Sequence, residues 1–533
     1  MSMRLCTSAL AIAACASAAQ AEFTLHVLHI NALHSRIEPI NRFDSTCSAE
    51  DDAAGECFGG VARVATKINE LRDQLIADGQ NVIVLDAGDQ FQGSLMYTTY
   101  KGAVEAEFME AIGFDAMAVG NHEFDDGPAA LRAFTDAVNF PVISGNLDLT
   151  SSEELNGQVD NHVVLEVGGE KIGVVSALAT DTVETSSPGP NVVFQDEIES
   201  LTADVATLEA EGVNKIIALT HVGLGKDIEI AGAVPGLDAV VGGHSHTYLS
   251  ASDDEAAGPY PTMVENGNVQ VPVVQAYAYS KYVGHLELTF SDDGVVTAAS
   301  GDTVLLDASV TPDEGIAARV AELAGPIEEL KSQVVSEAAE PIEGAREVCR
   351  AGECPMGNLV ADAMLDRVKD QGVTIAIQNG GGLRASIDAG EITMGEVLTV
   401  LPFQNTLATF QLKGADVIAA LENGVSQVEE GAGRFPQVAG LKYTWDASIA
   451  PGEGRVVEVM VADGDSFVPI APDKVYGVVT NNYMRGGGDG YAVFATNGME
   501  AYDFGPGLEL VVADYLADKG PYAPYTDGRI TQK

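Results

Sequence analysis

Short apolar runs rich in β-branched residues alternate with helical patterns through the first half of the chain, and this alternation limits the fold most strongly. The runs that predict strands are residues 23–30, 82–88, 116–121, 171–178, 215–221 and 238–246. Segments with helical periodicity lie between several of them, such as residues 61–78 and 196–212. Apolar strands buried on both faces and separated by helices are typical of a layered α/β fold.

The pattern changes around residues 312–340, an amphipathic helical segment in which we expect an interruption at Pro326. A helix over residues 356–371, a strand over 373–380, further strands with glycine-rich turns and a last helix near 508–519 follow. A chain of 533 residues also exceeds what one core usually serves. We therefore expect one α/β domain over 22–312, a linker helix over 313–340 and a second α/β domain over 341–533.

The first 21 residues have the features of a signal peptide. Arg4 precedes an apolar run, and Ala19-Gln20-Ala21 fits a signal-peptidase site before Glu22. A lipoprotein signal ending at Cys15 is the alternative, but the alanines before Glu22 favour simple cleavage. No later stretch is apolar for long enough to be a transmembrane segment. We expect a periplasmic or secreted protein.

Four cysteines follow this segment, and they form two close pairs, Cys47 with Cys57 and Cys349 with Cys354. In an oxidising compartment, two local disulfides are the economical interpretation. A CxxC-type metal or redox site would need a different spacing.

The formal net charge is −51. Such a charge repels polyanions and argues against a nucleic-acid polymer as a partner, although local cations can still bind a small anion. We interpret the charge as a solvated surface suited to salty surroundings. No sequence feature indicates the oligomeric state.

Potential metal-binding or catalytic side chains follow the ends of five predicted strands. They are, in chain order, His34; Asp89; Asn121, His122 and Asp125; His221; and His244 with His246. Taken singly, such a residue is more often a cap or a surface residue. That interpretation is kept for the four other histidines, His26, His29, His162 and His285.

Jointly, the five strand ends predict a metal centre, because ligands gather beyond the carboxyl ends of strands in an open α/β sheet. Imidazole and carboxylate groups suit Zn, Mn, Fe or Co, and one shared carboxylate suits two neighbouring ions. Asp89 is the expected bridge. Two divalent metal ions supply the nucleophile and the cationic charge that hydrolysis of a phosphate ester needs.

These motifs resemble the calcineurin-like metallophosphoesterases, and those of the second half resemble the 5′-nucleotidase and UDP-sugar hydrolase family. The second-half motifs are CRAGECPMGNL (349–359), QNGGGLR (378–384), LPFQNTLATFQLKG (401–414) and NNYMRGGGDGY (481–491). The resemblance covers nearly the whole chain after residue 21. It implies a two-metal α/β sandwich, a C-terminal α/β substrate-binding domain and hydrolysis of 5′-nucleotides to nucleoside and phosphate.

The resemblance also implies roles for individual residues. The implied ligands are His34, Asp89 and His246 for one metal, and Asp89, Asn121, His221 and His244 for the other. His122, oriented by Asp125, would face the phosphate and stabilise the transition state or protonate the leaving oxygen.

For the substrate, the implied binding residues are Arg350, Asn379, Arg384, Phe403, Tyr483 and Asp489. The arginines and the asparagine would hold anionic and polar parts, since an arginine fork binds phosphate in bidentate fashion. The two rings would stack on the base, and the aspartate would accept from ribose hydroxyls. Without the resemblance, the two rings would be interpreted as ordinary core aromatics.

One position departs from the family pattern. The family's first motif has the form NDxH, whereas this chain has Asn31-Ala32-Leu33-His34. In an extended segment, residues 32 and 34 point the same way and Asn31 points to the other face. Ala32 therefore removes a negative ligand from the first metal, which weakens hydroxide activation most.

Three explanations compete for Ala32: an inactivated variant of an ordinary enzyme, a natural protein that works with a weakened metal, or a binding protein that kept the scaffold. We favour the inactivated variant, because every other motif is intact. The rival enzymes are 2′,3′-cyclic nucleotide phosphodiesterases, UDP-sugar pyrophosphatases and a thiosulfate-releasing hydrolase. A non-catalytic nucleotide-binding protein is the alternative from a different class.

Overall fold

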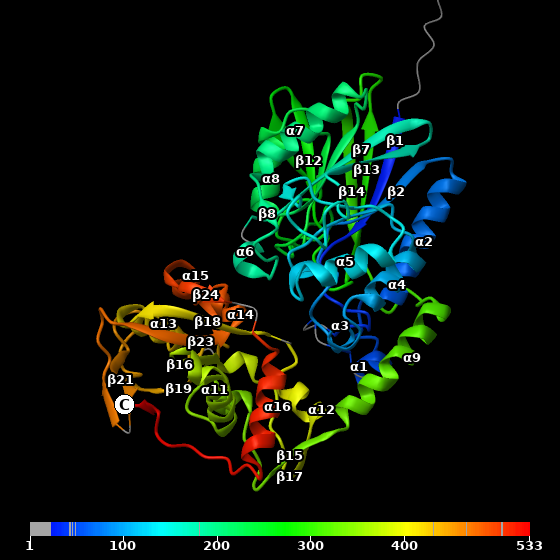
Figure 1. The fold of residues 1–533 in the computed structure, drawn as a ribbon. Coiled ribbons are helices and arrows are strands. Elements are labelled where there is room, and N and C mark those ends of the chain that lie inside the picture. Colours follow the sequence, from blue (N-terminus) through cyan, green and yellow to red (C-terminus); the bar gives the residue numbers. More distant parts are fainter. Residues whose placement is uncertain are drawn as a thin grey trace, which may run out of the picture.

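The computed structural model describes residues 23–533, apart from residues 42, 43, 45, 48, 181, 404, 430, 465, 503 and 504. The predicted signal peptide and Cys15 lie outside the described residues. Two α/β bodies follow one another along the chain, an N-terminal domain in blue to green and a C-terminal domain in yellow to red (Figure 1). The predicted α/β fold class is confirmed. None of the described helices is long and apolar enough to cross a bilayer.

The N-terminal domain contains two six-stranded sheets, with orders β14-β13-β1-β2-β3-β4 and β11-β12-β10-β9-β7-β6. The strands are β1 Phe23–Ile30, β2 Asn81–Asp86, β3 Ala116–Ala118, β4 Val142–Ile143, β6 His162–Val167, β7 Glu170–Leu178, β9 Ile216–His221, β10 Ala239–Val241, β11 Thr262–Asn266, β12 Val269–Val274, β13 Tyr282–Phe290 and β14 Val296–Leu305. The central strands of each sheet are parallel, and the antiparallel strands lie toward the edges.

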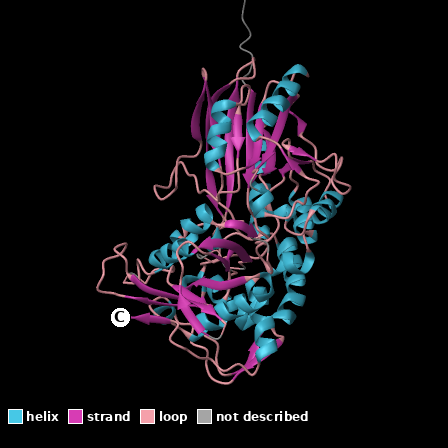
Figure 2. Ribbon diagram, turned by 60° about the vertical axis from the view of Figure 1, so that its left-hand side comes forward, coloured by secondary structure: helices cyan, strands magenta, loops and turns pink. Residues whose placement is uncertain are grey.

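The two sheets pack face to face and helices cover their outer faces (Figure 2). The alternation of side chains along β1 shows how: Leu25 and Val27 enter the core between the sheets, whereas Leu28 packs under the helices. The covering helices are α2 Val61–Ala77, α4 Ala103–Ile112 and α5 Pro128–Ala137 on the first sheet, and α7 Glu197–Ala210 and α8 Leu224–Ala233 on the second.

The segment between the domains differs from its prediction. Helix α9 (Glu314–Lys331) runs without interruption through Pro326, so the expected break there is wrong. Its buried face, which includes Val320, Leu323 and Ile327, packs into the core of the N-terminal domain, and this packing outweighs the cost of the proline. The helix also ends early, because residues 334–338 form strand β15 (Val334–Ala338), paired with β17 (Gly390–Thr393).

The C-terminal domain is built on a five-stranded mixed sheet of order β19-β16-β23-β18-β24. Its strands are β16 Val373–Asn379, β18 Leu407–Lys413, β19 Pro436–Ala439, β23 Val475–Asn481 and β24 Met499–Tyr502. Helices α11 (Pro355–Val368) and α16 (Leu508–Lys519) pack in one core, and α13 (Gly414–Gly424) and α15 (Ala492–Asn497) in another. A smaller sheet contains β20 Leu441–Trp445, β21 Val456–Asp463, β22 Ser466–Pro469 and β25 Ile530–Gln532.

Short elements complete the two domains. They are α1 Ala49–Ala54, α3 Leu95–Tyr100, β5 Leu147–Asp148, α6 Thr182–Thr185, β8 Val193–Phe194, α10 Arg346–Cys349, α12 Met394–Val400 and α14 Asn482–Arg485. Both predicted disulfides are confirmed: Cys47 with Cys57, and Cys349 with Cys354, with Cα atoms 5.8 Å and 5.2 Å apart.

Candidate active site

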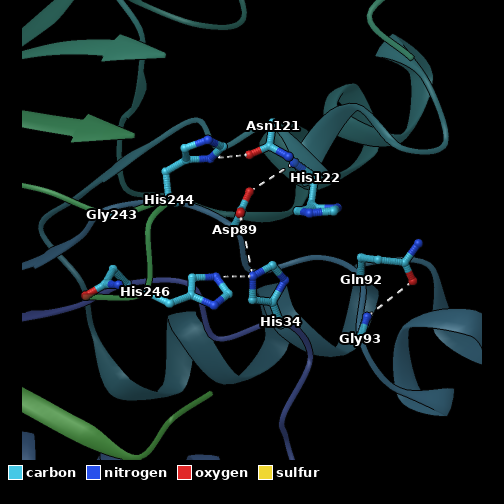
Figure 3. A network of polar contacts seen from close by, with 12 residues as sticks. His34, Asp89, Gln92, Gly93, Asn121, His122, Gly243, His244 and His246 are labelled. Atoms are coloured by element: carbon cyan, nitrogen blue, oxygen red, sulfur yellow. Dashed lines mark hydrogen bonds and ion pairs between the residues drawn. The ribbon is translucent and has the colours of Figure 1, made fainter. Parts of the chain in front are cut away.

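The side chains predicted at strand ends meet at one end of the N-terminal sandwich (Figure 3). They are His34 after β1, Asp89 after β2, Asn121 and His122 after β3, His221 at the end of β9, and His244 and His246 after β10. The first three of these strands belong to one sheet and the last two to the other. Parallel strands of both sheets therefore deliver their carboxyl ends to one place.

The ligand atoms form two groups that share Asp89. In the first group, His34 Nε2 lies 2.9 Å from His246 Nε2 and 3.6 Å from Asp89 Oδ2. In the second, His221 Nε2 lies 2.9 Å from the same Oδ2. His244 Nδ1 lies 2.9 Å from Asn121 Oδ1. The arrangement places one carboxylate between two sets of nitrogen and oxygen donors.

The backbone is strained at these positions. His34, Asp89, His244 and His246 have φ values of 51°, 59°, 71° and 50°, in the left-handed region that residues with a side chain rarely adopt. Such conformations persist only where the surrounding structure fixes them, and they cluster at functional sites. Here they turn the chain sharply at the strand ends, which brings the side chains inward.

The electrostatics of the cluster favour a cation. Burial lowers the pKa of His34 well below its usual range and that of His246 to about 4, so both rings are neutral and their nitrogens can act as ligands. Burial opposes the charge of Asp89, but His221 and His122 beside it lower the pKa of its carboxyl well below the usual range. An ionised carboxylate, 2% exposed, thus lies among imidazoles.

The donors fit a divalent metal ion. His221 Nδ1 lies 2.6 Å from the carbonyl oxygen of Ala87, which accepts the Nδ1 proton and orients the ring so that Nε2 faces Asp89. Burial opposes the charge of His221, but Asp89, 2.9 Å from that Nε2, outweighs it and raises the pKa of the ring, so Nε2 carries a proton that a metal ion would displace. Nitrogen with carboxylate donors suits borderline divalent ions.

His122 lies beside the cluster and is held by a carboxylate. Its Nδ1 is 2.7 Å from Asp125 Oδ2, and Asp125 also accepts from Ser186 Oγ at 2.8 Å and Gln92 Nε2 at 3.2 Å. Burial opposes protonation of His122, but Asp125 and Asp89 outweigh it and raise its pKa to about 10. The imidazole is therefore a fixed cation and a potential proton donor.

Sequence reasoning missed Glu123, which fixes the loops of the cluster. Its buried carboxylate accepts from the backbone N–H groups of Asp89 at 2.9 Å, Gln90 at 2.8 Å, Phe91 at 3.1 Å and Gly120 at 2.7 Å. In the sequence, the feature that points to Glu123 is its place between His122 and Asp125. Four bonds to two strand-end loops make it the connection between Asp89 and Asn121.

The segment with Ala32 is not extended, so the predicted alternation of side chains over residues 31–34 is wrong. Ala32 has a φ of 49° and is fully buried. Its N–H donates to Gly88 O at 2.8 Å, and the N–H of His34 donates to Asp89 O at 2.9 Å. Residue 32 therefore lies beside the loop that carries Asp89. Asn31, by contrast, hydrogen-bonds to the backbone of residues 276 and 277.

A cavity of about 530 Å³ between the domains reaches this cluster. His246, Arg36, Tyr277 and Tyr279 line it from the N-terminal domain. All six predicted substrate-binding residues line it from the other: Arg350, Asn379, Arg384, Phe403, Tyr483 and Asp489. The structure thus brings His246 and all the predicted substrate-binding residues to one cavity.

Within the cavity, Asp489 is the centre of a polar network. Its Oδ2 accepts from Asn379 Nδ2 at 2.7 Å, and its Oδ1 accepts from the hydroxyl of Tyr483 at 3.1 Å. The Arg384 guanidinium lies 5.4 Å from the ring centre of Phe403. Carboxylate, amide, guanidinium and aromatic groups together can bind a ligand that has a ring, hydroxyls and an anionic group.

His122 opens to a different cavity, of about 490 Å³, together with Asn121 and His244. None of the six predicted substrate-binding residues lines that second cavity. The metal cluster therefore lies between the two. The remaining histidines lie elsewhere: His26 contacts His285, His29 contacts Tyr260, and His162 lies near Asp204.

Comparison with known proteins agrees with this geometry. Residues 25–248 match the family model for calcineurin-like phosphoesterases, and residues 332–496 match the 5′-nucleotidase C-terminal domain. A 5′-nucleotidase of Diplobatis ommata is 40% identical over 532 residues, which cover 96% of this chain and 90% of that protein. The chain belongs to the 5′-nucleotidase family.

Other members of the 5′-nucleotidase family show similar agreement. The snake venom 5′-nucleotidase of Gloydius brevicauda is 38% identical over 96% of this chain and 90% of its own length. The crystal structure of a 5′-nucleotidase precursor from Thermus thermophilus has 41% identity and a TM-score of 0.66, covering 96% of this chain and 99% of that one. Membership makes the chain a metal-dependent hydrolase of ester bonds and supports 5′-nucleotide hydrolysis.

Replacing Glu123 with glutamine tests its role in the 5′-nucleotidase site. Glu123→Gln replaces one of the two carboxyl oxygens that accept from these N–H groups with an NH₂ donor, so we expect metal affinity to fall by roughly 10- to 100-fold. Equilibrium dialysis against Mn²⁺ measures it. The matched control is Glu110→Gln, because Glu110 also accepts from a backbone N–H, that of Asn139, away from the cluster. Equal affinity in both variants would show that Glu123 does not position the ligands.

Proposed function

We propose that this chain removes phosphate from 5′-nucleotides at the cluster around Asp89, with the nucleoside held by the C-terminal domain. The observation that carries the proposal is the cavity shared by His246 and the six substrate-binding candidates. We assign the boundaries 22–312, 313–340 and 341–533 to the catalytic domain, the linker and the substrate-binding domain. The family-model matches at 25–248 and 332–496 support this division of roles.

The proposed ligands are His34, Asp89 and His246 for one ion, and Asp89, Asn121, His221 and His244 for the other. Two bound divalent ions, with Zn, Mn or Co favoured by these donors, supply positive charge at the phosphate oxygens and lower the pKa of water. The protein's contribution is to keep the donors neutral or ionised as required. Burial does this for His34 and His246, and the surrounding imidazoles do it for Asp89.

His122 acts on the phosphate as a cation and as a proton donor to the leaving oxygen. Asp125 fixes its Nδ1 and keeps the ring charged, so the proton on Nε2 is the one available for transfer. Its backbone N–H also donates to Asp89 Oδ1 at 2.9 Å, which ties its position to the shared carboxylate. A fixed cation next to a developing anion stabilises the transition state.

The C-terminal domain selects the substrate. Arg350, Asn379 and Arg384 bind the anionic and polar parts. Asp489 accepts from the ribose hydroxyls, and Phe403 with Tyr483 stacks on the base. Tyr483 is half exposed and Phe403 partly buried, so both rings retain open surface in the cavity. The two disulfides support a secreted or periplasmic location, where the first 21 residues would direct the chain.

Ala32 impairs this activity in our proposal. The position lies beside the Asp89 loop, where an aspartate carboxylate would add a negative ligand for the ion at His34. Without it, two neutral imidazoles and one shared carboxylate would hold the first ion. Fewer anionic ligands lower the affinity for a divalent cation, and a lost ion removes the activation of water.

Ala32→Asp should raise metal occupancy and activity together. We expect a gain of at least 100-fold in phosphate release from AMP, since the change restores a negative ligand. The measurement compares AMP, UDP-glucose and 2′,3′-cyclic AMP as substrates, with Mn²⁺ or Zn²⁺ supplied and the metal content determined. Ala32→Asn is the matched control, because an asparagine side chain has the size of aspartate but no charge.

Each outcome separates the proposed functions. Preference for AMP supports the 5′-nucleotidase, whereas faster release from UDP-glucose or the cyclic nucleotide would favour a rival enzyme. A chain that binds AMP but does not hydrolyse it, even with aspartate at 32, would be a nucleotide-binding protein. Unchanged metal content and activity in Ala32→Asp would contradict our account of Ala32.

The role of His122 is tested in the Ala32→Asp background. His122→Asn removes the cation and the proton donor, so we expect kcat to fall by about 10²- to 10⁴-fold. Metal content should remain unchanged, because the His122 side chain belongs to neither ligand group. Loss of metal in this variant would instead assign His122 a structural role.

A further inference from the structure

Arg350 lies in a short loop that is closed at both ends. Cys349 and Cys354 form the disulfide that brackets it, and both are fully buried. The Arg350 side chain is 7% exposed and lines the cavity that His246 reaches. Its Nη1 donates to Gly431 O at 3.2 Å. Its buried Nε has no hydrogen-bond partner among the described residues, so a donor remains available to a ligand.

One buried side chain holds this loop from the neighbouring sheet. Gln437, on β19, is fully buried. Its Nε2 donates to Cys349 O at 2.9 Å and to Gly352 O at 2.7 Å, and its Oε1 accepts from the N–H of Cys354 at 3.3 Å. A single amide thus binds the first, fourth and last residues of the loop Cys349–Cys354.

The sequence leaves room for this amide. A Cβ atom at Gly357 would lie 2.2 Å from Gln437 Oε1, so only glycine fits there. Gln437 in turn pairs with Gln378 on β16, the residue before Asn379. The sheet that presents Asn379 to the cavity therefore also fixes the loop that presents Arg350.

We propose that Gln437 is a positioning residue for substrate binding: it holds the loop Cys349–Cys354 so that the Arg350 guanidinium meets the anionic group of the nucleotide. Gln437 lines neither cavity at the cluster and acts only through the loop. The disulfide fixes the ends of the loop relative to each other, whereas Gln437 fixes the loop relative to the sheet. This inference rests on the proposed role of Arg350.

A double-mutant cycle with binding measurements tests the proposal. Gln437→Met keeps the length of the side chain and removes its three hydrogen bonds. We expect the Kd for AMP to rise roughly tenfold, the value of one charge-assisted hydrogen bond. The Kd for adenosine should stay within about twofold, because adenosine has no anionic group for Arg350. Isothermal titration calorimetry with Mn²⁺ present gives both values.

The decisive comparison uses an Arg350→Ala background. If Gln437 acts through Arg350, adding Gln437→Met there changes the Kd for AMP by less than about twofold. A full tenfold effect in that background, or an equal loss of adenosine binding, would overturn the proposal. If Arg350→Ala alone leaves AMP binding unchanged, the assigned role of Arg350 fails first.

Two further variants guard against misfolding. Gln437→Glu keeps the size but turns a carboxylate oxygen toward the carbonyl oxygens of Cys349 and Gly352, so it should raise the Kd for AMP at least as much as Gln437→Met. Gln411→Met is the control, because Gln411 lies in the same sheet, donates to Glu500 at 2.6 Å and lines neither cavity. A thermal unfolding scan shows that each variant is folded. An unchanged Kd for AMP in folded Gln437→Met and Gln437→Glu would contradict the proposal.

Discussion

Asp89 places an ionised carboxylate in the interior, at the meeting point of two sheets. An isolated buried charge is costly, so the fold must surround it with compensating groups. The structure does this with His221, whose Nε2 lies 2.9 Å from Asp89 Oδ2, and with the charged ring of His122. The same requirement makes the cluster a place that favours cations. The sandwich, the strained turns and the buried Glu123 all follow from holding this arrangement together.

The division of labour between the domains follows from where the polar groups lie. The N-terminal domain gathers imidazoles and carboxylates at the ends of parallel strands, which suits charge stabilisation at phosphorus. The C-terminal domain offers arginines, an amide, a carboxylate and two rings, which suits recognition of a nucleoside with an anionic group. Their shared cavity joins the two functions. The linker helix α9 packs its apolar face into the first of these domains and also contacts α12 of the second.

Much of this could be predicted from the sequence, because the relevant signals are local. Strand β1 and helix α16 have the predicted bounds, since hydrophobic periodicity decides both. The strand-end rule also selected the residues that now lie together. Local rules failed where tertiary packing decides: α9 continues through Pro326 because three of its apolar residues are buried, and the segment at Ala32 turns where alternation assumed an extended chain.

Glu123 and Gln437 could not be found in this way. Their importance lies in the backbone groups that they bind, and those groups come together only in the folded chain. A buried acid inside a motif and a glutamine on a short strand look ordinary in sequence. Residues that position others are therefore the class that sequence reasoning misses most readily.

The central claim is that Asp89 joins two cations. Anomalous X-ray scattering from crystals of the Ala32→Asp chain soaked in Mn²⁺ tests it most directly. Our account predicts two peaks about 3.5–4 Å apart, each within bonding distance of an Asp89 carboxylate oxygen. A single peak, or peaks that do not contact Asp89, would contradict it.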